Sequence, residues 1–215
     1  MKKIYIFLLL LIAVFVGLFV NEIKKAKNIT VKRETTPIIS SQQFDIPIYK
    51  NDQIYGNPGA MLTIVEFTDF NCKKCSASHK KLVEFIAKNP NKARLIWKGL
   101  PQTKIFGGDT QKIHQTAYCA GQQKQFWPFV NLAISDNKIT TDDIDKLATK
   151  LKLNSNNLNT CLKTQNQIDA ITASSTLFAK QMGFYKAPTV FINNYWINTD
   201  EDIDITEMLK TFIKE

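Results

Sequence analysis

The chain has 215 residues, of which 44% are hydrophobic and 11% aromatic, and its formal net charge is +9. A chain of this length and composition can bury a substantial core, which excludes a disordered or fibrous protein. Its lysines are spread along the chain beside many acidic residues, without a dense basic stripe, so we expect no nucleic-acid binding.

The beginning of the chain predicts targeting to a membrane. Lys2 and Lys3 precede an uncharged apolar run over residues 4–20. The run is longer than the apolar region of a typical secretory signal, lacks a small-x-small cleavage site, and reaches the roughly 17 residues of a membrane span. We therefore expect residues 1–27 to be an uncleaved anchor, with a cleaved signal as the alternative because lysines also follow the run. Either way, the remaining chain is expected in the periplasm or another extracytoplasmic compartment, where disulfides persist.

The next part of the chain predicts a tether and the first half of a folded domain. Residues 28–43 are polar and contain proline, and are expected to connect the anchor to a domain at 44–215. The β-rich run 62–68 follows an Asn-Pro-Gly turn signal and predicts a buried strand. Apolar residues at helical spacing predict a helix over 73–88. A second strand is expected over 93–100.

The middle of the chain has a helical pattern, and strands return near the end. The expected helical insertion covers about 110–182, with helices at 111–123, 126–135, 142–151, 156–162 and 165–182. Strands are then expected at 189–192 and 195–197, joined by an Asn-Asn pair that tolerates a tight hairpin, followed by a helix at 203–213. The order is therefore β-α-β, a helical block, and β-β-α.

Two cysteines lie where the first predicted strand ends and the next helix begins. Cys72 is placed at the helix N-terminus, whose unpaired N–H groups and positive dipole end favour a thiolate. Lys73 and Lys74 would act in the same direction. Cys75, one turn further on, is expected to be drawn back into the protein. The pair therefore indicates a thiol-disulfide exchange centre with an exposed nucleophile and a resolving partner.

Other uses of the pair remain open. An inert structural disulfide is disfavoured, because so small a loop removes little entropy from the unfolded chain. A copper or zinc site on Cys72 and Cys75 could include His79, but a structural zinc site needs four ligands and no second close pair exists. We expect His79 to lie on the helix surface, where it could still tune the thiols electrostatically. No metal and no cofactor are therefore expected.

The other two cysteines lie in the helical block. Cys119 and Cys161 have no neighbouring pair of cationic residues, so a second active site is not expected there. In an oxidising compartment such a leftover pair most simply forms a structural disulfide, with two buried free thiols as the alternative.

Three stretches of this chain resemble the DsbA-like thioredoxin-fold thiol-disulfide oxidoreductases. They are residues 65–75 followed by His79, residues 120–133, and residues 186–192 with the sequence Lys-Ala-Pro-Thr-Val-Phe-Ile. Their order matches the strand, C-x-x-C helix, inserted helices and X-Pro-Thr strand of that family. The likeness covers roughly residues 60–214. It implies an α/β thioredoxin fold with an inserted helical domain between the β-α-β and β-β-α halves.

The resemblance also implies a role for each matching residue. Cys72 would be the attacking cysteine that forms the mixed disulfide, and Cys75 would resolve it. Pro188 would be a cis proline facing the pair, with Ala187 offering backbone hydrogen bonds to the substrate; an ordinary trans proline is the alternative. Glu66 would be the buried acid that exchanges a proton with Cys75, and a salt-bridged strand carboxylate is the alternative.

The expected function is that of a disulfide oxidase acting on exported client proteins with free thiols. Stabilising the Cys72 thiolate makes the protein's own disulfide more oxidising. Reoxidation would need a quinone-linked membrane partner of the DsbB type. Lys73, Lys74 and Ala187 differ from the residues typical of the best-known oxidases. A disulfide isomerase or reductase therefore remains an alternative, as does a thiol-based copper chaperone.

Overall fold

The computed structural model describes residues 2–27, 39–101, 103–104, 108–135, 139–184, 186–198 and 204–213. The chain divides into two compact units, Met1–Thr35 and Thr36–Glu215. The first contains helix α1 (Lys2–Lys27), in which Ile4–Glu22 has a mean hydropathy of 2.8. By length and composition this segment could cross a membrane, and a signal sequence near the N-terminus would pass the same test.

The second unit is built on a six-stranded sheet with the order β1-β8-β7-β3-β4-β2. β3 is parallel to β4, and the other neighbouring strands are antiparallel. The strands are β1 (Ile39–Gln43), β2 (Gln53–Gly56), β3 (Leu62–Thr68), β4 (Ala93–Gly99), β7 (Thr189–Ile192) and β8 (Tyr195–Ile197). Two short strands, β5 (Thr103–Lys104) and β6 (Gly108–Asp109), pair separately. Six of the seven residues of β3 are buried, as expected for a strand covered on both faces.

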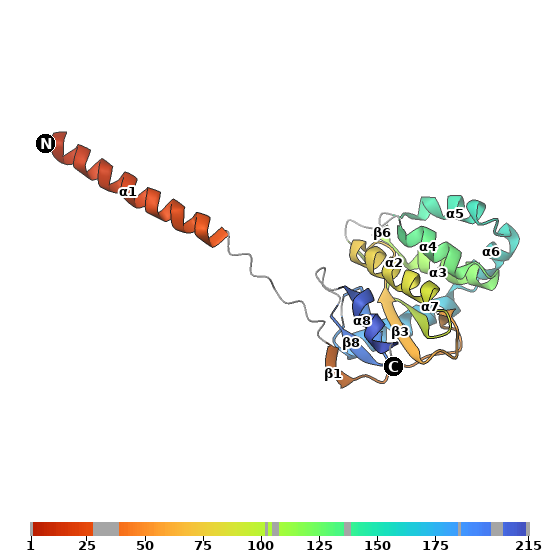
Figure 1. The fold of residues 1–215 in the computed structure, drawn as a ribbon. Helices are drawn as coiled ribbons and strands as arrows, with labels where there is room; N and C mark the ends of the chain where they lie inside the picture. Colours follow the sequence, from red (N-terminus) through yellow and green to blue (C-terminus); the bar gives the residue numbers. More distant parts are fainter. Residues whose placement is uncertain are drawn as a thin grey trace. The chain divides into compact units, whose positions relative to one another are not determined.

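Helices cover both faces of the sheet and form a block of their own. They are α2 (Lys73–Lys88), α3 (Gln111–Gln122), α4 (Phe126–Ser135), a 3-10 turn (Thr141–Asp143), α5 (Ile144–Lys150), α6 (Ser155–Leu162), α7 (Gln165–Gln181) and α8 (Ile205–Phe212). Figure 1 shows α3, α4, α5 and α6 grouped together beside the strands.

Alternate residues of the central strands face two different apolar clusters. Ile64 and Leu95 pack with Leu82 of α2 and Leu209 of α8 on one face. On the other face, residues of β3, β4 and β7 pack against α7; they include Val65, Phe67, Ile96 and Phe191. A third cluster joins the helical block to the beginning of α2 and includes Phe70, Cys75, Trp97, Cys119, Phe129 and Cys161. The end of β3 and the beginning of α2 thus lie beside the helical block.

The strands and helices expected from local patterns agree closely with these bounds, but the short pair β5 and β6 and two strands of the main sheet were missed. β1 lies inside the segment expected to be a tether, where it pairs with β8 through Ile39↔Ile197 and Gln43↔Tyr195. The tether assignment was therefore wrong for 39–43, and the rest of it, 28–38, lies outside the described residues. β2 pairs with β4 at the opposite edge. Both are short edge strands without a buried residue, and neither has the apolar alternation that marks a strand.

Candidate active site

The turn between β3 and α2 places the two cysteines of the C-x-x-C motif. Cys72 is the N-cap of α2: its backbone is extended, with φ −135° and ψ 108°, and its Sγ accepts the N–H of Cys75 at 3.1 Å. The two residues form a disulfide. Cys75 is completely buried, whereas Cys72 is only partly buried. An incoming thiolate can therefore reach Cys72 and not Cys75.

The loop before β7 lies against the same sulfur. The Ala187-Pro188 peptide bond is cis, and the carbonyl oxygen of Ala187 lies 3.4 Å from Cys72 Sγ. An oxidised sulfur has no proton to donate, so this is a contact and not a hydrogen bond. The sheet brings the loop there, because β7 pairs with β3 through Phe67↔Thr189. Two segments 115 residues apart thus face each other across the redox pair.

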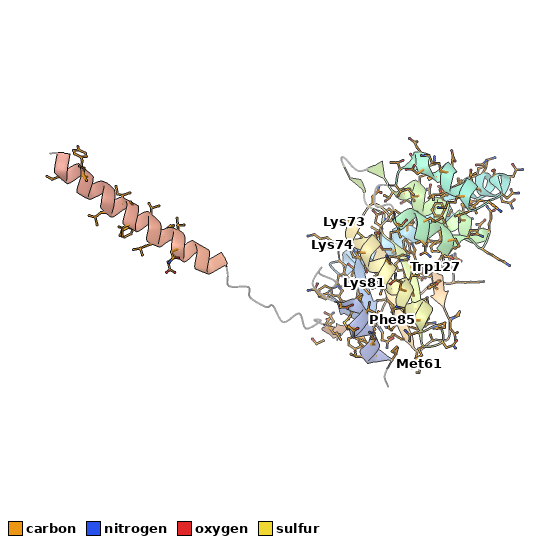
Figure 2. All side chains as sticks on the ribbon, turned by 45° about the horizontal axis from the view of Figure 1, so that its top comes forward. Met61, Lys73, Lys74, Lys81, Phe85 and Trp127 are labelled. Atoms are coloured by element: carbon orange, nitrogen blue, oxygen red, sulfur yellow. A yellow bond between two sulfur atoms is a disulfide. The ribbon has the colours of Figure 1, made fainter. Side chains whose placement is uncertain are left out.

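The surroundings of Cys72 on α2 are positively charged. Lys73 and Lys74 form the first turn of the helix and are exposed, and this turn contains no acidic residue. Figure 2 shows both lysines at the beginning of α2, with Lys81 and Phe85 further along the same helix. We therefore predict that the helix N-terminus and the two ammonium groups act together in favour of negative charge on the Cys72 sulfur.

Replacing Lys73 and Lys74 by glutamine is expected to raise the pKa of the Cys72 thiol in the reduced protein, since two nearby exposed cations are lost. The measurement is an ultraviolet titration of thiolate absorbance. The matched control replaces Lys80 and Lys81, which are also exposed on α2 but lie further from the sulfur. No shift in the Lys73 and Lys74 variant would show that these lysines do not act on Cys72. An equal shift in both double variants would show that the first-turn lysines act no more strongly than the distant pair.

Glu66 of β3 is completely buried and is paired with His79 of α2, one helical turn after Cys75. Glu66 Oε2 lies 2.8 Å from His79 Nδ1, and His79 Nε2 lies 3.0 Å from Asn131 Oδ1 of α4. Among the described residues, Glu66 Oε1 has no hydrogen-bond partner. Glu66 is thus a paired strand carboxylate, with one oxygen left over for another group.

The expected surface position of His79 is wrong, because only 2% of this residue is exposed. The same face of α2 also buries Cys75, Leu82 and Ile86 against the sheet, and a histidine one turn after Cys75 belongs to that face. Burial alone would lower the pKa of His79, but the charge and hydrogen bond of Glu66 and the hydrogen bond of Asn131 outweigh it. The pKa of His79 is therefore raised above 6.5.

A second buried acid holds the turn that leads to Cys72, and the sequence reasoning missed it. Asp69 accepts the hydroxyl proton of Thr110 at 2.6 Å and lies 3.1 Å from His114 Nε2. Its other oxygen accepts the N–H of Asn71 at 3.3 Å. This turn is thereby tied to the beginning of α3. Two features of the sequence could have indicated the pairing of Asp69 with His114. Asp69 directly follows a predicted buried strand, and His114 is one of only two histidines in the chain.

The remaining two cysteines join helices of the inserted block. Cys119 of α3 and Cys161 of α6 form a disulfide, with their Cα atoms 5.7 Å apart. Both are buried in the cluster that also contains Cys75. The bond therefore connects two helices around the core that supports the buried cysteine of the redox pair.

The described residues contain no group of three or more histidine, cysteine or acidic side chains placed to hold a metal ion. Both ring nitrogens of His79 already have hydrogen-bond partners. A copper ion on Cys72 and Cys75 could recruit His79 only if one of these bonds broke.

The comparisons with known proteins agree with the observed fold. A family model described as thioredoxin matches residues 49–215. A thioredoxin-like oxidoreductase from Silicibacter pomeroyi DSS-3 superposes with a TM-score of 0.65 and 20% identity, covering 77% of this chain and 92% of that one. The thiol-disulfide exchange protein alpha-DsbA2 from Wolbachia pipientis gives a TM-score of 0.65 and 17% identity, covering 77% and 87%. BdbD from Bacillus subtilis gives a TM-score of 0.62 and 17% identity, covering 79% of this chain and 96% of that one.

One protein with a similar segment is much longer than this chain. The Na(+)/H(+) antiporter NhaA 3 of Salinispora tropica is 26% identical over 103 residues, which are 47% of this chain and 16% of the antiporter. This likeness therefore concerns a small part of the antiporter.

Proposed function

This chain belongs to the thioredoxin family and is a thiol-disulfide oxidoreductase, and we propose that it acts as a DsbA-like oxidase that introduces disulfides into exported proteins. The observation that carries the proposal is the position of Cys72 at the N-terminus of α2, beside two exposed lysines. These groups stabilise a thiolate, which exists only in the reduced protein. Whatever stabilises the reduced form makes the disulfide a stronger oxidant.

The reaction follows from the different exposure of the two sulfurs. A client thiolate attacks Cys72 Sγ, the bond between Cys72 and Cys75 breaks, and its electron pair goes to Cys75 Sγ, which takes a proton through Glu66. A second client thiolate then attacks the client sulfur of the mixed disulfide and releases Cys72 as a thiolate. The client loses two electrons and gains a disulfide, and the protein is left reduced.

The loop at Ala187 and Pro188 supplies the contact surface for the client. Its backbone lies against Cys72, at the edge of the redox pair that solvent can reach. An extended client segment can lie along this loop and bond to its backbone, as in other strand-addition complexes. Such binding uses no client side chain and therefore suits a protein with many clients.

The location and the redox partner complete the proposal. Helix α1 would hold the domain at the outer face of the inner membrane, in the periplasm or an equivalent compartment. A quinone-linked membrane protein of the DsbB type would accept the two electrons and restore the Cys72–Cys75 disulfide.

The redox potential of the Cys72–Cys75 pair tests the direction of the reaction. We expect the full chain in detergent, equilibrated with glutathione buffers, to have a potential near the roughly −120 mV of strong oxidases. Alkylation and peptide mass analysis would separate this pair from Cys119–Cys161. A value near the roughly −270 mV of thioredoxin would overturn the oxidase and favour the reductase. An intermediate value near about −180 mV, as in protein disulfide isomerase, would favour the isomerase.

A further inference from the structure

A buried acid that exchanges protons with a buried thiol needs a route to water. Each time the disulfide re-forms, Cys75 must lose a proton, and each time it opens, the thiolate of Cys75 must gain one. Glu66 and Cys75 are both 0% exposed. A proton that reaches Glu66 from Cys75 is therefore still inside the protein, and the reaction cannot repeat until that proton leaves.

The hydrogen bonds of Glu66 lead towards the surface. Glu66 is bonded to His79 Nδ1, and His79 Nε2 is bonded to Asn131, which is an exposed residue of α4. At the inner end, Cys75 and His79 lie one turn apart on the same buried face of α2, so that Glu66 lies under the helix face that holds Cys75. Glu66 Oε1 is the oxygen without a partner among the described residues. A continuous chain of groups thus runs from the unpaired Glu66 oxygen to an exposed amide.

The bonds of His79 leave a single mobile proton between the ring and Glu66. Because Nε2 faces the amide oxygen of Asn131, it carries a proton and donates it. Nδ1 then either accepts a proton from the carboxylic acid of Glu66 or donates one to the carboxylate. The pair can therefore hold the proton on either residue without breaking a hydrogen bond. The raised pKa of His79 is consistent with a ring that readily takes this proton.

The other neighbours of His79 do not compete for the proton. Trp127 of α4 stacks on the His79 ring, with the ring centroids 6.2 Å apart, and Trp97 of β4 meets the ring edge-on, with the centroids 5.5 Å apart. Figure 2 shows Trp127 beside α2. Lys98, next to Trp97 on β4, points to the opposite face of the sheet and pairs with Asp52. Among the described ionisable groups, Glu66 of β3 is hydrogen-bonded to His79. His114 of α3 packs on Trp97 and Tyr55 of β2 packs on Trp127, each on a tryptophan that also contacts His79.

We propose that His79 and Asn131 form a proton relay between Glu66 and solvent, and that this relay sets the rate at which Cys75 is deprotonated. The proposal rests on the proton exchange between Glu66 and Cys75 in the proposed function. His79 and Asn131 do not touch the sulfurs and act through Glu66. Before the disulfide re-forms, the mobile proton lies on Glu66 Oε2. Cys75 then gives its proton to Glu66 Oε1, the Oε2 proton passes to His79 Nδ1, and a solvent water beside the exposed Asn131 accepts the Nε2 proton. One proton thus leaves Cys75 for water, and the number of protons held by Glu66 and His79 is unchanged. When the disulfide opens, each proton moves in the reverse direction.

The reaction of the reduced full chain with glutathione disulfide isolates the relevant step. First, the Cys72 thiolate attacks glutathione disulfide, forming a mixed disulfide and releasing one glutathione thiolate. Second, Cys75 loses its proton and attacks Cys72 Sγ, releasing the second glutathione. Rapid acid quenching followed by mass analysis measures the mixed disulfide, and therefore the second rate constant, across pH 5 to 8.

Removing the Asn131 amide, the outermost group of the relay, is expected to slow the second step about 10-fold. This is part of the roughly 10²–10⁴-fold rate enhancement that general acid–base catalysis contributes. Asn131→Leu removes the acceptor at an exposed position, and Asn131→Asp restores an oxygen there and should return the rate to within about 2-fold of wild type. Asn159→Leu is the matched control, because Asn159 is also an exposed helical asparagine, and it should leave the rate unchanged. His79→Asn keeps a hydrogen-bond donor for Glu66, but the asparagine amide does not take up or release a proton in this pH range. It should slow the step about 100-fold and remove the histidine-dependent part of the pH profile.

The outcomes separate the relay from the function on which it rests. Slowing in Asn131→Leu with recovery in Asn131→Asp supports the relay. Rates within about 2-fold of wild type in Asn131→Leu and His79→Asn, with slowing in Glu66→Gln, would overturn the relay and keep the role of Glu66. If Glu66→Gln also keeps the wild-type rate, both the relay and the proposed role of Glu66 fail. The redox potential remains a separate test of the oxidase.

Discussion

Replacing Cys75 by alanine is expected to stop the reaction at the mixed disulfide, so that client proteins accumulate as covalent adducts on Cys72. Without Cys75, no internal thiol can attack the mixed disulfide and release a client that has been bound in error. The variant has no redox disulfide for a client thiolate to attack. Its Cys72 thiolate remains partly exposed at the helix N-terminus, so it should attack a disulfide in a client, form the mixed disulfide and displace one client thiolate. Catalytic disulfide formation should fall by roughly 100-fold or more, since the remaining thiol cannot itself form the redox disulfide.

The measurement is a non-reducing gel of cells that produce the full chain with Cys75→Ala. High-mass species that contain the protein should appear, and reductant should remove them. The matched control carries Cys72→Ser in addition to Cys75→Ala and should show none of these species. Adducts in the control as well would place the captured thiol at Cys119 or Cys161 and contradict the assigned role of Cys72.

Replacing Cys119 and Cys161 together by alanine is expected to lower the free energy of unfolding by about 3 to 4 kcal/mol. The two residues are 42 positions apart, so their disulfide removes much more entropy from the unfolded chain than the three-residue separation of the redox pair. Both sulfurs are also buried in the cluster that holds α3, α4 and α6 together. Their loss should therefore loosen the helical block before the sheet.

Chemical denaturation of the oxidised full chain in detergent, followed by circular dichroism, measures this loss. The control is the Cys72→Ala/Cys75→Ala variant, which opens only a very short loop and should lose about 2 kcal/mol or less. A smaller loss in the Cys119 and Cys161 variant than in this control would contradict a structural role for the second disulfide.

The local sequence pattern was sufficient to predict strands and helices whose burial shows as an apolar pattern within a few residues. The expected strand at 62–68 and helix at 73–88 coincide with β3 (Leu62–Thr68) and α2 (Lys73–Lys88). An apolar run buried on both faces and an apolar stripe at helical spacing each show in a short window. β1 and β2 have no such mark, because only their backbone pairing with β8 and β4 makes them strands.

In the candidate site too, some residues could be placed from the local sequence and others could not. Cys72, the two lysines and Cys75 form one short motif, so their order along the first turn of α2 could be read directly. His79 lies in the same helix, but whether its face is buried depends on β3 and α4, which lie elsewhere in the chain. The expectation of an exposed histidine was wrong for this reason.

The sequence by itself determined that the chain has an N-terminal apolar segment long enough to cross a membrane, a C-x-x-C motif at the start of a helix, and the order of strands and helices of a thioredoxin fold. These properties depend on composition and on neighbours a few residues apart. Only the tertiary structure decided that Ala187 lies against Cys72, that Asp69 is held by Thr110 and His114, and that Glu66 is connected through His79 to Asn131. These contacts join segments separated in sequence, and the sheet and the packing of helices on it bring them together.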